Sequence, residues 1–540
     1  MLLTKRVVDF ITVLVIVLCL YGCSTTTGNP KIRIPDASSI SSDIVKSGKL
    51  SNELAFLTAS EFAEMIRSRQ VTSLQVVDAL LSRIARHNST LKAIVTLDVD
   101  KVRQRAKEAD AALDRGENWG PLHGVPVTIK DNLATTGIRT TSSYKLTENH
   151  IPDFDAPVVE RLKKAGAIIL GKTNMPLLGL DYQANSPIFG ISNNPWDVTR
   201  TTGGSTGGGA AAVAAGLSPL EIGNDLGGSV RIPAAFCGVY GIKPTERLVS
   251  TSGINPGLPK RDSKSIRYLL ANGPLARSIA DLKLALSIIL GPDAKDPNIP
   301  DVKLSDQKKS LKNLRIAWSD DFGGVPVTED TRTALANLAV ALTDAGCHVE
   351  NVNPPEFDFL SAWNTYGELI DFRFGVYTPL FARVLMCMNN WSNAKEVPMQ
   401  KMVCPMSYEK FLRALTKREE FMVSMDNFLS NYDVFLAPVH VTTAYKHIAP
   451  DNYFGPFAIY DTPVMVNNEP VNYWVANASY AAIFNLTGNP VVSMPIAYDK
   501  DGLPIGIQVV GKRWHDLDLL NNVAEIDKVS NAFKHPPGFE

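Results

Sequence analysis

The chain has 540 residues, with 54 Lys and Arg against 55 Asp and Glu and a formal net charge of −1. This length can bury a sizeable core, and we expect one catalytic body. Because the charges balance and the body of the chain holds no basic run, the sequence lacks the positive field of a nucleic-acid-binding protein. We therefore predict a small-molecule partner and no nucleic-acid partner.

Residues 1–23 differ from the rest of the chain. Lys5 and Arg6 come first, a largely apolar run follows from Ile11 to Tyr21, and Gly22-Cys23 closes the segment. This order of basic, apolar and small residues is that of an export signal. The last four residues are similar to a bacterial lipobox, in which the cysteine is lipidated.

These features predict an exported protein of the cell envelope, either lipid-anchored or secreted. We expect a signal peptide or lipoprotein leader at 1–23, a polar tether at 24–52 and a catalytic domain at 53–540. Lipidation of Cys23 would attach the protein to a membrane, and plain secretion is an alternative. A retained anchor is not favoured, because the apolar run is shorter than the roughly 20 residues that a membrane span needs.

Two capping boxes open the part of the chain that should fold first. Thr58-Ala-Ser-Glu61 and Thr72-Ser-Leu-Gln75 place a threonine three residues before Glu or Gln, which predicts two helix starts. A third helix is predicted from Val99 to Arg115, with Gly116 as its end. Pro126 to Lys130 then has the pattern of a short buried strand that ends in a lysine.

Strand and helix patterns alternate through the rest of the chain. Pro157 begins a helix that ends before Gly166, and the apolar run Ala167–Leu170 follows as a strand. Alternation of this kind predicts the α/β class with a covered sheet. The later elements expected are a strand at 314–318, a helix near 331–345, and strands near 347–352, 432–438, 490–496 and 503–511.

Several segments of the second half carry no chemistry of their own. Gly291–Leu311, rich in Pro, Asp and Lys, is the best internal linker, and we expect the strands beyond it to complete the same sheet. Met386–Met406 is a candidate substrate cover or ordinary surface packing. Cys387 and Cys404 can pair or remain free thiols. No cysteine or histidine has metal-ligand spacing, so we predict neither a metal nor a cofactor.

Two glycine-rich segments hold the candidate chemistry, GGSTGGGAAAVAAG at 203–216 and NDLGGSVRIPAAFCG at 224–238. Gly203–Gly207 fits the G-x-S-x-G elbow of α/β-hydrolases, but polar residues and a proline precede it where that motif needs an apolar strand. The helix expected from Ala210 would present N–H groups to a phosphate, yet no Lys-Ser/Thr follows the glycines. Neither alternative is favoured.

The two segments make chemical sense together with Lys130. Acyl transfer needs an oxygen nucleophile, a group that takes its proton and N–H donors where negative charge develops. Ser229, Ser205 and Lys130 can supply the nucleophile, a proton bridge and a base. Burial favours the neutral lysine that a base requires, whereas a salt bridge to Asp131 would keep it protonated. The oxyanion-hole candidates are the N–H groups of Leu226, Gly227, Gly228 and Ser229.

The chain resembles the amidase signature family over about residues 55 to 525. The resemblance rests on four ordered segments, which are GVPVTIKDN at 124–132, NPWDVTRTTGGSTGGGAAAVAAG at 194–216, NDLGGSVRIPAAFCGVYGIKPT at 224–245 and GLPIGIQVVGKRWHD at 502–516.

The resemblance implies a mixed central β-sheet covered by helices on both sides. It implies Ser229 as nucleophile, Ser205 as a bridging serine after a cis peptide from Gly204, and Lys130 as the final base. The residues implied to hold the two loops are Thr206, Asp225 and Arg231.

Thr206 stands where the family commonly has a second serine, and because threonine keeps the hydroxyl we expect activity to survive. The chain departs from the family pattern at two further places. Asn224 stands where the family often has threonine, and Arg247 where it often has glycine. Arginine is costly at positive φ, so we expect the local loop to differ if that turn needs one. We expect both departures to leave the catalytic positions untouched. Asn174–Gly190 is implied to line the acyl side of the substrate, although core packing explains its apolar residues equally well.

The implied function is an amidase that hydrolyses a carboxamide to a carboxylate and an amine or ammonia through an acyl-enzyme. One alternative is an amidotransferase subunit that works on aminoacyl-tRNA, against which the leader at 1–23 argues, and another is a serine esterase or lipase. A silent binding protein is disfavoured because Lys130, Ser205 and Ser229 are all present. The oligomeric state is left open.

Overall fold

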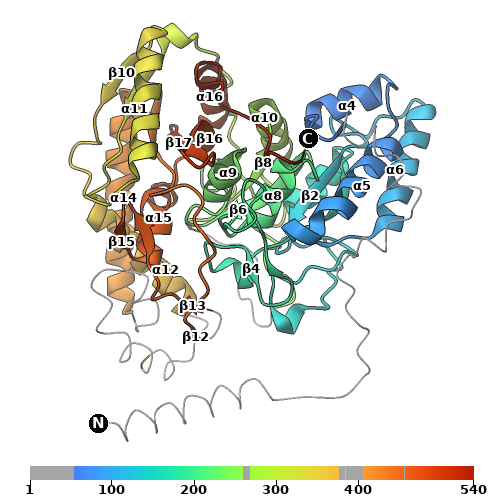
Figure 1. Ribbon diagram of the computed structural model, residues 1–540, viewed down its shortest axis with the longest axis horizontal. Coiled ribbons are helices and arrows are strands. Elements are labelled where there is room, and N and C mark those ends of the chain that lie inside the picture. The colour runs from blue at the N-terminus through green and yellow to red at the C-terminus, as the bar shows by residue number, and fades with distance from the viewer. Residues whose placement is uncertain (1–53, 259–267, 376–383, 385–405, 455–456, 540) are drawn as a thin grey trace, which may run out of the picture. The chain divides into compact units, whose positions relative to one another are not determined.

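A large mixed β-sheet organises the chain (Figure 1). The computed structural model describes residues 54–258, 268–375, 384, 406–454 and 457–539. Within them eleven strands form one sheet, in the order β1-β3-β2-β6-β8-β7-β16-β17-β11-β9-β10. The strands are β1 (Ile94–Thr96), β2 (Pro126–Lys130), β3 (Ile168–Thr173), β6 (Leu220–Asp225), β7 (Tyr240–Lys243), β8 (Ala271–Ala276), β9 (Arg315–Trp318), β10 (His348–Asn351), β11 (Val434–Pro438), β16 (Val491–Tyr498) and β17 (Pro504–Val510).

The pairing makes the sheet mixed. β2 is parallel to both β3 and β6, and β9 is parallel to both β10 and β11. The central strands β8, β7, β16 and β17 pair antiparallel with their neighbours. The two parallel groups are therefore joined by an antiparallel centre, and the site lies in the first group.

Helices cover both faces of this sheet, as the resemblance implied. They are α4 (Ala59–Arg67), α5 (Ser73–Leu91), α6 (Val99–Asp114), α7 (Pro157–Lys164), α8 (Gly207–Ala214), α9 (Arg231–Cys237), α10 (Ile279–Ile289), α11 (Glu329–Asp344), α12 (Phe359–Gly375), α14 (Tyr408–Ser430), α15 (Tyr473–Leu486) and α16 (Asp516–Ser530).

The alternation of side chains along β17 shows how the two layers are separated. Ile507 and Val509 belong to one core cluster together with buried leucines of α11 and α16. Gly506 lies against Ala235 of α9, and Gln508 accepts a hydrogen bond from Arg231 of the same helix. Because successive side chains of a strand point to opposite faces, α9 lies on one face and α11 and α16 lie on the other.

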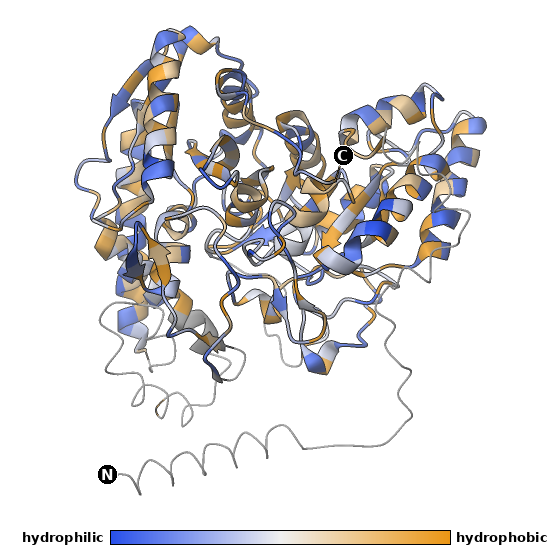
Figure 2. Cartoon of the chain, viewed as in Figure 1, coloured by the Kyte–Doolittle hydropathy of each residue, from blue (hydrophilic) through white to orange (hydrophobic). Residues whose placement is uncertain are grey.

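The outer helices show the amphipathic pattern that their sequences predict. In Figure 2 α5 and α6 carry alternating blue and orange stripes. The apolar stripe of α5 is buried, for example at Val76, Leu80 and Ile84. Both predicted capping boxes are confirmed, since Thr58 and Thr72 cap α4 and α5 with reciprocal side-chain and backbone hydrogen bonds.

The later elements also follow the sequence prediction, with ends that differ by a few residues. The strands expected beyond the linker at 291–311 become β9, β10, β11, β16 and β17, all in the same sheet. The helix expected from Ala210 starts earlier, at Gly207, directly after the serine motif. This start places the N-terminus of α8 at the candidate site.

Some predictions fall on parts of the chain that the structure does not describe. The leader at 1–23 and the tether at 24–52 lie outside the described residues, as do Cys387 and Cys404. The described cysteines Cys237 and Cys347 are free and buried. In the described ranges no helix combines the length and the apolar character needed to cross a bilayer.

Candidate active site

The site lies where two neighbouring parallel strands end. β2 ends at Lys130, and β6 ends at Asp225, directly before the loop that carries Ser229. The carboxyl ends of parallel strands meet at one edge of a sheet. This explains why Lys130 and Asn224 lie in contact although they are 94 positions apart in the chain. The serine motif at the start of α8 lies at the same edge, because Thr206 N–H donates to the Ser229 carbonyl at 3.1 Å.

Lys130 is fully buried and contacts the first predicted serine. Its Nζ lies 2.6 Å from Ser205 Oγ and 2.9 Å from Asn224 Oδ1, with the Asn224 carbonyl at 3.5 Å. A neutral amine has two N–H donors and one lone pair. The two Asn224 oxygens can take both N–H groups, which leaves the lone pair for the Ser205 hydroxyl.

Burial lowers the pKa of Lys130 to about 7, although Glu221 and Asp225 act in the opposite direction. Among the described residues Lys130 forms no ion pair within 4 Å, so the alternative salt bridge to Asp131 is not formed. Asp131 instead accepts hydrogen bonds from the N–H and hydroxyl of Thr141. A large fraction of Lys130 is therefore neutral at physiological pH.

Ser205 follows a cis peptide bond from Gly204, as the resemblance implied. The serine is 1% exposed, and its neighbours leave no room for a side chain at position 204. A Cβ added to Gly204 would approach Asp181 and Tyr182 backbone atoms to within 2.8 Å. A Cβ at Gly179 would come within 3.4 Å of Ser205 Oγ, so part of the segment 174–190 does border the site.

Ser229 is 6% exposed and sits in the loop between β6 and α9. Thr206 ties the Ser205 motif to this loop through its N–H and to β6 through its hydroxyl, which donates to the Asn224 carbonyl at 3.4 Å. Gly223 faces Thr206 so closely that a Cβ there would clash at 2.4 Å. The structure therefore places Lys130, Ser205 and the Ser229 backbone at one edge of the sheet.

The glycine loop is held by two buried tyrosines. Tyr182 donates its hydroxyl to the Gly227 carbonyl at 3.1 Å, and Tyr366 donates to the Leu226 carbonyl at 3.1 Å. Because the N–H of a trans peptide points opposite to its C=O, the Tyr366 contact directs the Gly227 N–H away from α12.

One of the four N–H groups predicted to form the oxyanion hole is already engaged within the protein. The Gly228 N–H donates to the Asp225 carboxylate at 2.8 Å, because Asp225 folds back under the loop. The N–H groups of Leu226, Gly227 and Ser229 donate to no group in the described part of the chain.

Asp225 and Arg231 form the buried scaffold beneath this loop. Both side chains are fully buried, and the guanidinium donates to both carboxylate oxygens at 3.0 Å. Arg231 also donates to Gln508 on β17 and to Asn485 on α15. Burial alone would raise the pKa of Asp225, but Arg231, Asn485 and the Gly228 N–H bring it well below its usual range. The pair thus anchors the loop to the sheet and to α15.

Sequence reasoning missed the role of Asn224. We expected its substitution to leave the catalytic positions untouched, but its side-chain oxygen contacts Lys130 and its amide donates to Asn132 at 2.8 Å. The second departure lies in a turn that does take positive φ. Arg247 has a φ of 67°, and its guanidinium lies over the Tyr268 ring at 5.7 Å. For Asn224, the change of side-chain chemistry at a family position was the available signal.

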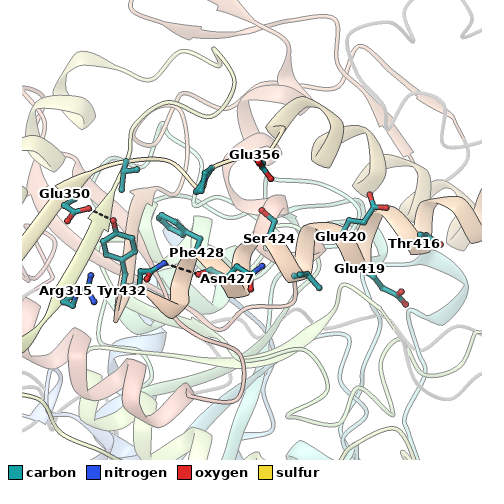
Figure 3. Close-up of a pocket in the computed structure, with 14 residues that line it drawn as sticks. Arg315, Glu350, Glu356, Thr416, Glu419, Glu420, Ser424, Asn427, Phe428 and Tyr432 are labelled. Atoms are coloured by element: carbon teal, nitrogen blue, oxygen red, sulfur yellow. Dashed lines mark hydrogen bonds between the residues drawn. The ribbon is translucent and has the colours of Figure 1, made fainter.

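Figure 3 shows a separate hollow between α14 and the segment that follows β10. Glu350 accepts a hydrogen bond from Tyr432 at one end, and Glu419 and Glu420 lie along α14 at the other. None of the predicted catalytic residues lines it. In the residues that the structure describes, no cluster of three His, Cys, Asp or Glu side chains is arranged to hold a metal ion.

The mixed sheet and the buried lysine beside two glycine-rich serine loops fit the enzyme family that the sequence resembles. The chain belongs to the Amidase family, whose model matches residues 75–520. It is 32% identical to a glutamyl-tRNA(Gln) amidotransferase subunit from Carboxydothermus hydrogenoformans, over 90% of this chain and 98% of that protein.

Solved structures agree with this assignment. The fold is similar to that of the corresponding glutamyl-tRNA(Gln) amidotransferase subunit from Thermotoga maritima, with a TM-score of 0.69, 25% identity, and coverage of 89% of this chain and 98% of that one. It is also similar to a bacterial aryl acylamidase of the amidase signature family, with a TM-score of 0.74 and 23% identity, over 89% and 99% of the two chains.

The comparisons overturn the prediction of an exported protein of the cell envelope. The curated relatives that align over about 90% of the chain are named as subunits of glutamyl-tRNA(Gln) amidotransferase, and none of these names supports export. The basic-apolar-small order at 1–23 therefore misled, because a short apolar N-terminal run is a compositional pattern that is not specific to export signals.

Proposed function

We propose that this chain cleaves the carbon–nitrogen bond of a carboxamide through an acyl-enzyme on Ser229. The Ser229 Oγ attacks the carbonyl carbon while its proton passes to Ser205 Oγ, and the Ser205 proton passes to Lys130 Nζ. The carbonyl oxygen becomes an oxyanion, which faces the N–H groups of Leu226, Gly227 and Ser229.

The second half of the reaction reverses the proton path. The Lys130 proton returns through Ser205 to the leaving nitrogen as the carbon–nitrogen bond breaks, so ammonia or an amine departs. An acceptor then attacks the acyl group with loss of a proton along the same route. When that acceptor is water, the product is a carboxylate and Ser229 is restored.

A single observation carries this proposal. Lys130 Nζ lies 2.6 Å from Ser205 Oγ in a fully buried position without an ion-pair partner among the described residues. A lysine lowered to a pKa of about 7 combines a large neutral fraction with useful basicity at neutral pH.

A second candidate specifies the amide and the acceptor. The relatives that match about 90% of the chain are named as one subunit of glutamyl-tRNA(Gln) amidotransferase. They favour the version in which glutamine supplies ammonia for a tRNA-bound acyl group and other subunits complete the enzyme. The expectation of no nucleic-acid partner would then not hold. A free-standing amidase remains the alternative that uses the same site.

Labelling with a fluorophosphonate tests the chemistry first. We expect one adduct on Ser229 of the purified full chain, located by peptide mass spectrometry, with labelling lost in Ser229→Ala and strongly slowed in Lys130→Met. The matched control Lys243→Met removes another fully buried lysine, on β7, and should label normally. An adduct on Ser205 alone, or no adduct, would refute the assignment.

Ammonia release then separates the two candidates. The full chain is given glutamine, or a set of aryl and alkyl carboxamides, and ammonia is measured. Turnover of the carboxamides without glutamine turnover supports the free-standing amidase. Glutamine turnover that rises when the other amidotransferase subunits and glutamyl-tRNA are added supports the amidotransferase.

A further inference from the structure

A second titratable side chain lies on the same face of the sheet as Lys130. Glu221 on β6 is the register partner of Thr128 on β2. Lys130 is two residues further along β2, and side chains two apart share a face. Thr173 on β3 is the register partner of Lys130, and its hydroxyl donates to Glu221 Oε1 at 2.7 Å. Lys130 and Glu221 therefore share one buried layer between the sheet and α8.

The fold makes room for this carboxyl group at Gly209 of α8. A Cβ at Gly209 would lie 2.5 Å from the Glu221 Cδ and 2.6 Å from its Oε1. Glu221 is 0% exposed, and its Oε2 has no hydrogen-bond partner in the described part of the chain. A buried, half-satisfied carboxyl group is costly unless a charge stabilises it. Two threonines and a glycine thus enclose an acid that the packing alone does not explain.

Few other charged side chains of the described residues lie around Glu221. α8 contributes no titratable side chain, because Gly207–Ala214 are all Gly, Ala or Val. On the other face of the sheet, Lys172 donates to Thr135 Oγ1 at 2.9 Å and is the cation with the largest effect on Asp131. Lys172 therefore acts on Glu221 through the sheet, and its charge lowers the pKa of Glu221 more than the charge of Lys130 does.

Asp225 is the other carboxylate that affects Lys130. It is already paired with the Arg231 guanidinium, so its charge is largely neutralised. Glu221 is left as the anion best placed to respond when Lys130 gains a proton.

We propose that Glu221 is a positioning residue that supplies the buried counter-charge for the Lys130 ammonium formed while Ser229 attacks. This inference rests on the proposed function of the site. Lys130 Nζ takes the proton from Ser205, and Glu221 stays a carboxylate that stabilises the new cation without touching the substrate. Burial raises the pKa of Glu221 to about 7, while the charge of Lys130 lowers it, so protonation of Lys130 favours the carboxylate form of Glu221.

Glu221→Gln tests the proposal, because it removes the charge and keeps the shape. The readout is the rate of fluorophosphonate labelling of Ser229 against pH, which needs no natural substrate. In the unaltered protein the rate should rise with pH as Lys130 loses its proton, around pH 7. Loss of the nearby anion lowers the pKa of Lys130, so this acidic limb should move down by about one pH unit. The plateau rate should fall about tenfold, since a one-unit weaker base and an unpaired cation both raise the barrier.

Asp516→Asn is the matched control. Asp516 is also a fully buried carboxyl group, but it accepts from Thr245 N–H and Oγ1 at 2.7 and 2.6 Å at the start of α16. The Asp516→Asn variant should show the same acidic limb and the same plateau in its labelling rate as the unaltered protein. Thermal unfolding reports whether each variant folds. If Glu221→Gln does not fold, Thr173→Val removes the donor to Glu221 Oε1 and should shift the limb in the same direction by less.

The outcomes are distinct. An acidic limb and a plateau that stay unchanged in Glu221→Gln would overturn the proposal, as would an equal shift in Asp516→Asn. Failure of the unaltered protein to label at Ser229 would instead remove the proposed function on which this inference rests. A limb that moves only in the Glu221 and Thr173 variants establishes the positioning role.

Discussion

Replacing Asp225 by asparagine should destabilise the protein more than any exposed substitution. The carboxylate accepts six hydrogen bonds, from the backbone N–H groups of Gly228, Val230 and Arg231, from two guanidinium nitrogens of Arg231 and from Asn485. Asparagine keeps one acceptor oxygen and turns an NH₂ group toward these donors. It also leaves the Arg231 guanidinium without its counter-ion at a site that is 0% exposed.

The size of the effect follows from the loss of one partner of a buried ion pair. Such a change costs about 3–5 kcal/mol, because the remaining charge stays desolvated and unpaired. A surface pair offers the contrast. Arg69 and Asp114 lie 2.7 Å apart with side chains 58% and 71% exposed, so Asp114→Asn should cost less than about 1 kcal/mol.

Urea unfolding, followed by circular dichroism on both variants and the unaltered protein, measures this difference. The sign of the pH dependence is a second check. Since the folded state lowers the pKa of Asp225, its contribution to stability is complete above the usual aspartate pKa of about 3.9 and declines as pH falls further. Between pH 7 and 5 the gap between Asp225→Asn and the unaltered protein should stay constant. A cost below about 1 kcal/mol would refute the account of this pair as the anchor of the loop.

Two further predictions concern the loop and the first helix. Tyr366→Phe removes the hydroxyl that donates to the Leu226 carbonyl, and fluorophosphonate labelling of Ser229 should slow up to about tenfold, the equivalent of one hydrogen bond. An unchanged labelling rate would exclude a role of this contact in fixing the Gly227 N–H. Thr58→Ala removes the cap of α4, where the Glu61 N–H donates to Thr58 Oγ1 at 3.2 Å, and should cost about 1 kcal/mol in urea unfolding. A loss of more than about 3 kcal/mol in the free energy of unfolding would show that Thr58 stabilises more than the start of α4.

Local elements were predictable where short-range physics decides them. The capping boxes at Thr58 and Thr72 satisfy the first N–H groups of their helices within four residues, so no distant contact is needed. Pro157 at the start of α7 and the buried strand ending at Lys130 were read from equally local patterns. The ends of elements were less predictable. α8 begins at Gly207 because the glycines pack against Asn174 and Thr202, contacts that no local pattern reveals.

The sequence predicted which residues belong to the candidate site, but it did not predict the hydrogen bonds among them. The motifs and their spacing predicted Lys130, Ser205 and Ser229 as candidate catalytic residues. The structure places all three at one edge of the sheet. The engagement of the Gly228 N–H by Asp225 was not visible, because it depends on how a side chain folds under its own loop. The segment at 1–23 shows the opposite failure, in which a compositional pattern suggested export that the relatives contradict.

The sequence by itself determined the α/β class, the capped helix starts at Thr58 and Thr72, and the residue types that can transfer a proton, because these depend on neighbours along the chain. Only the tertiary structure decided which of those residues share an environment. The pKa of Lys130 is lowered because β2 and β6 lie side by side and bury its amine, while Asn224 on β6 contacts that amine and Glu221 on β6 acts on it by charge. Burial and charge act through space, over separations such as the 94 residues between Lys130 and Asn224, and so they are set by the sheet order.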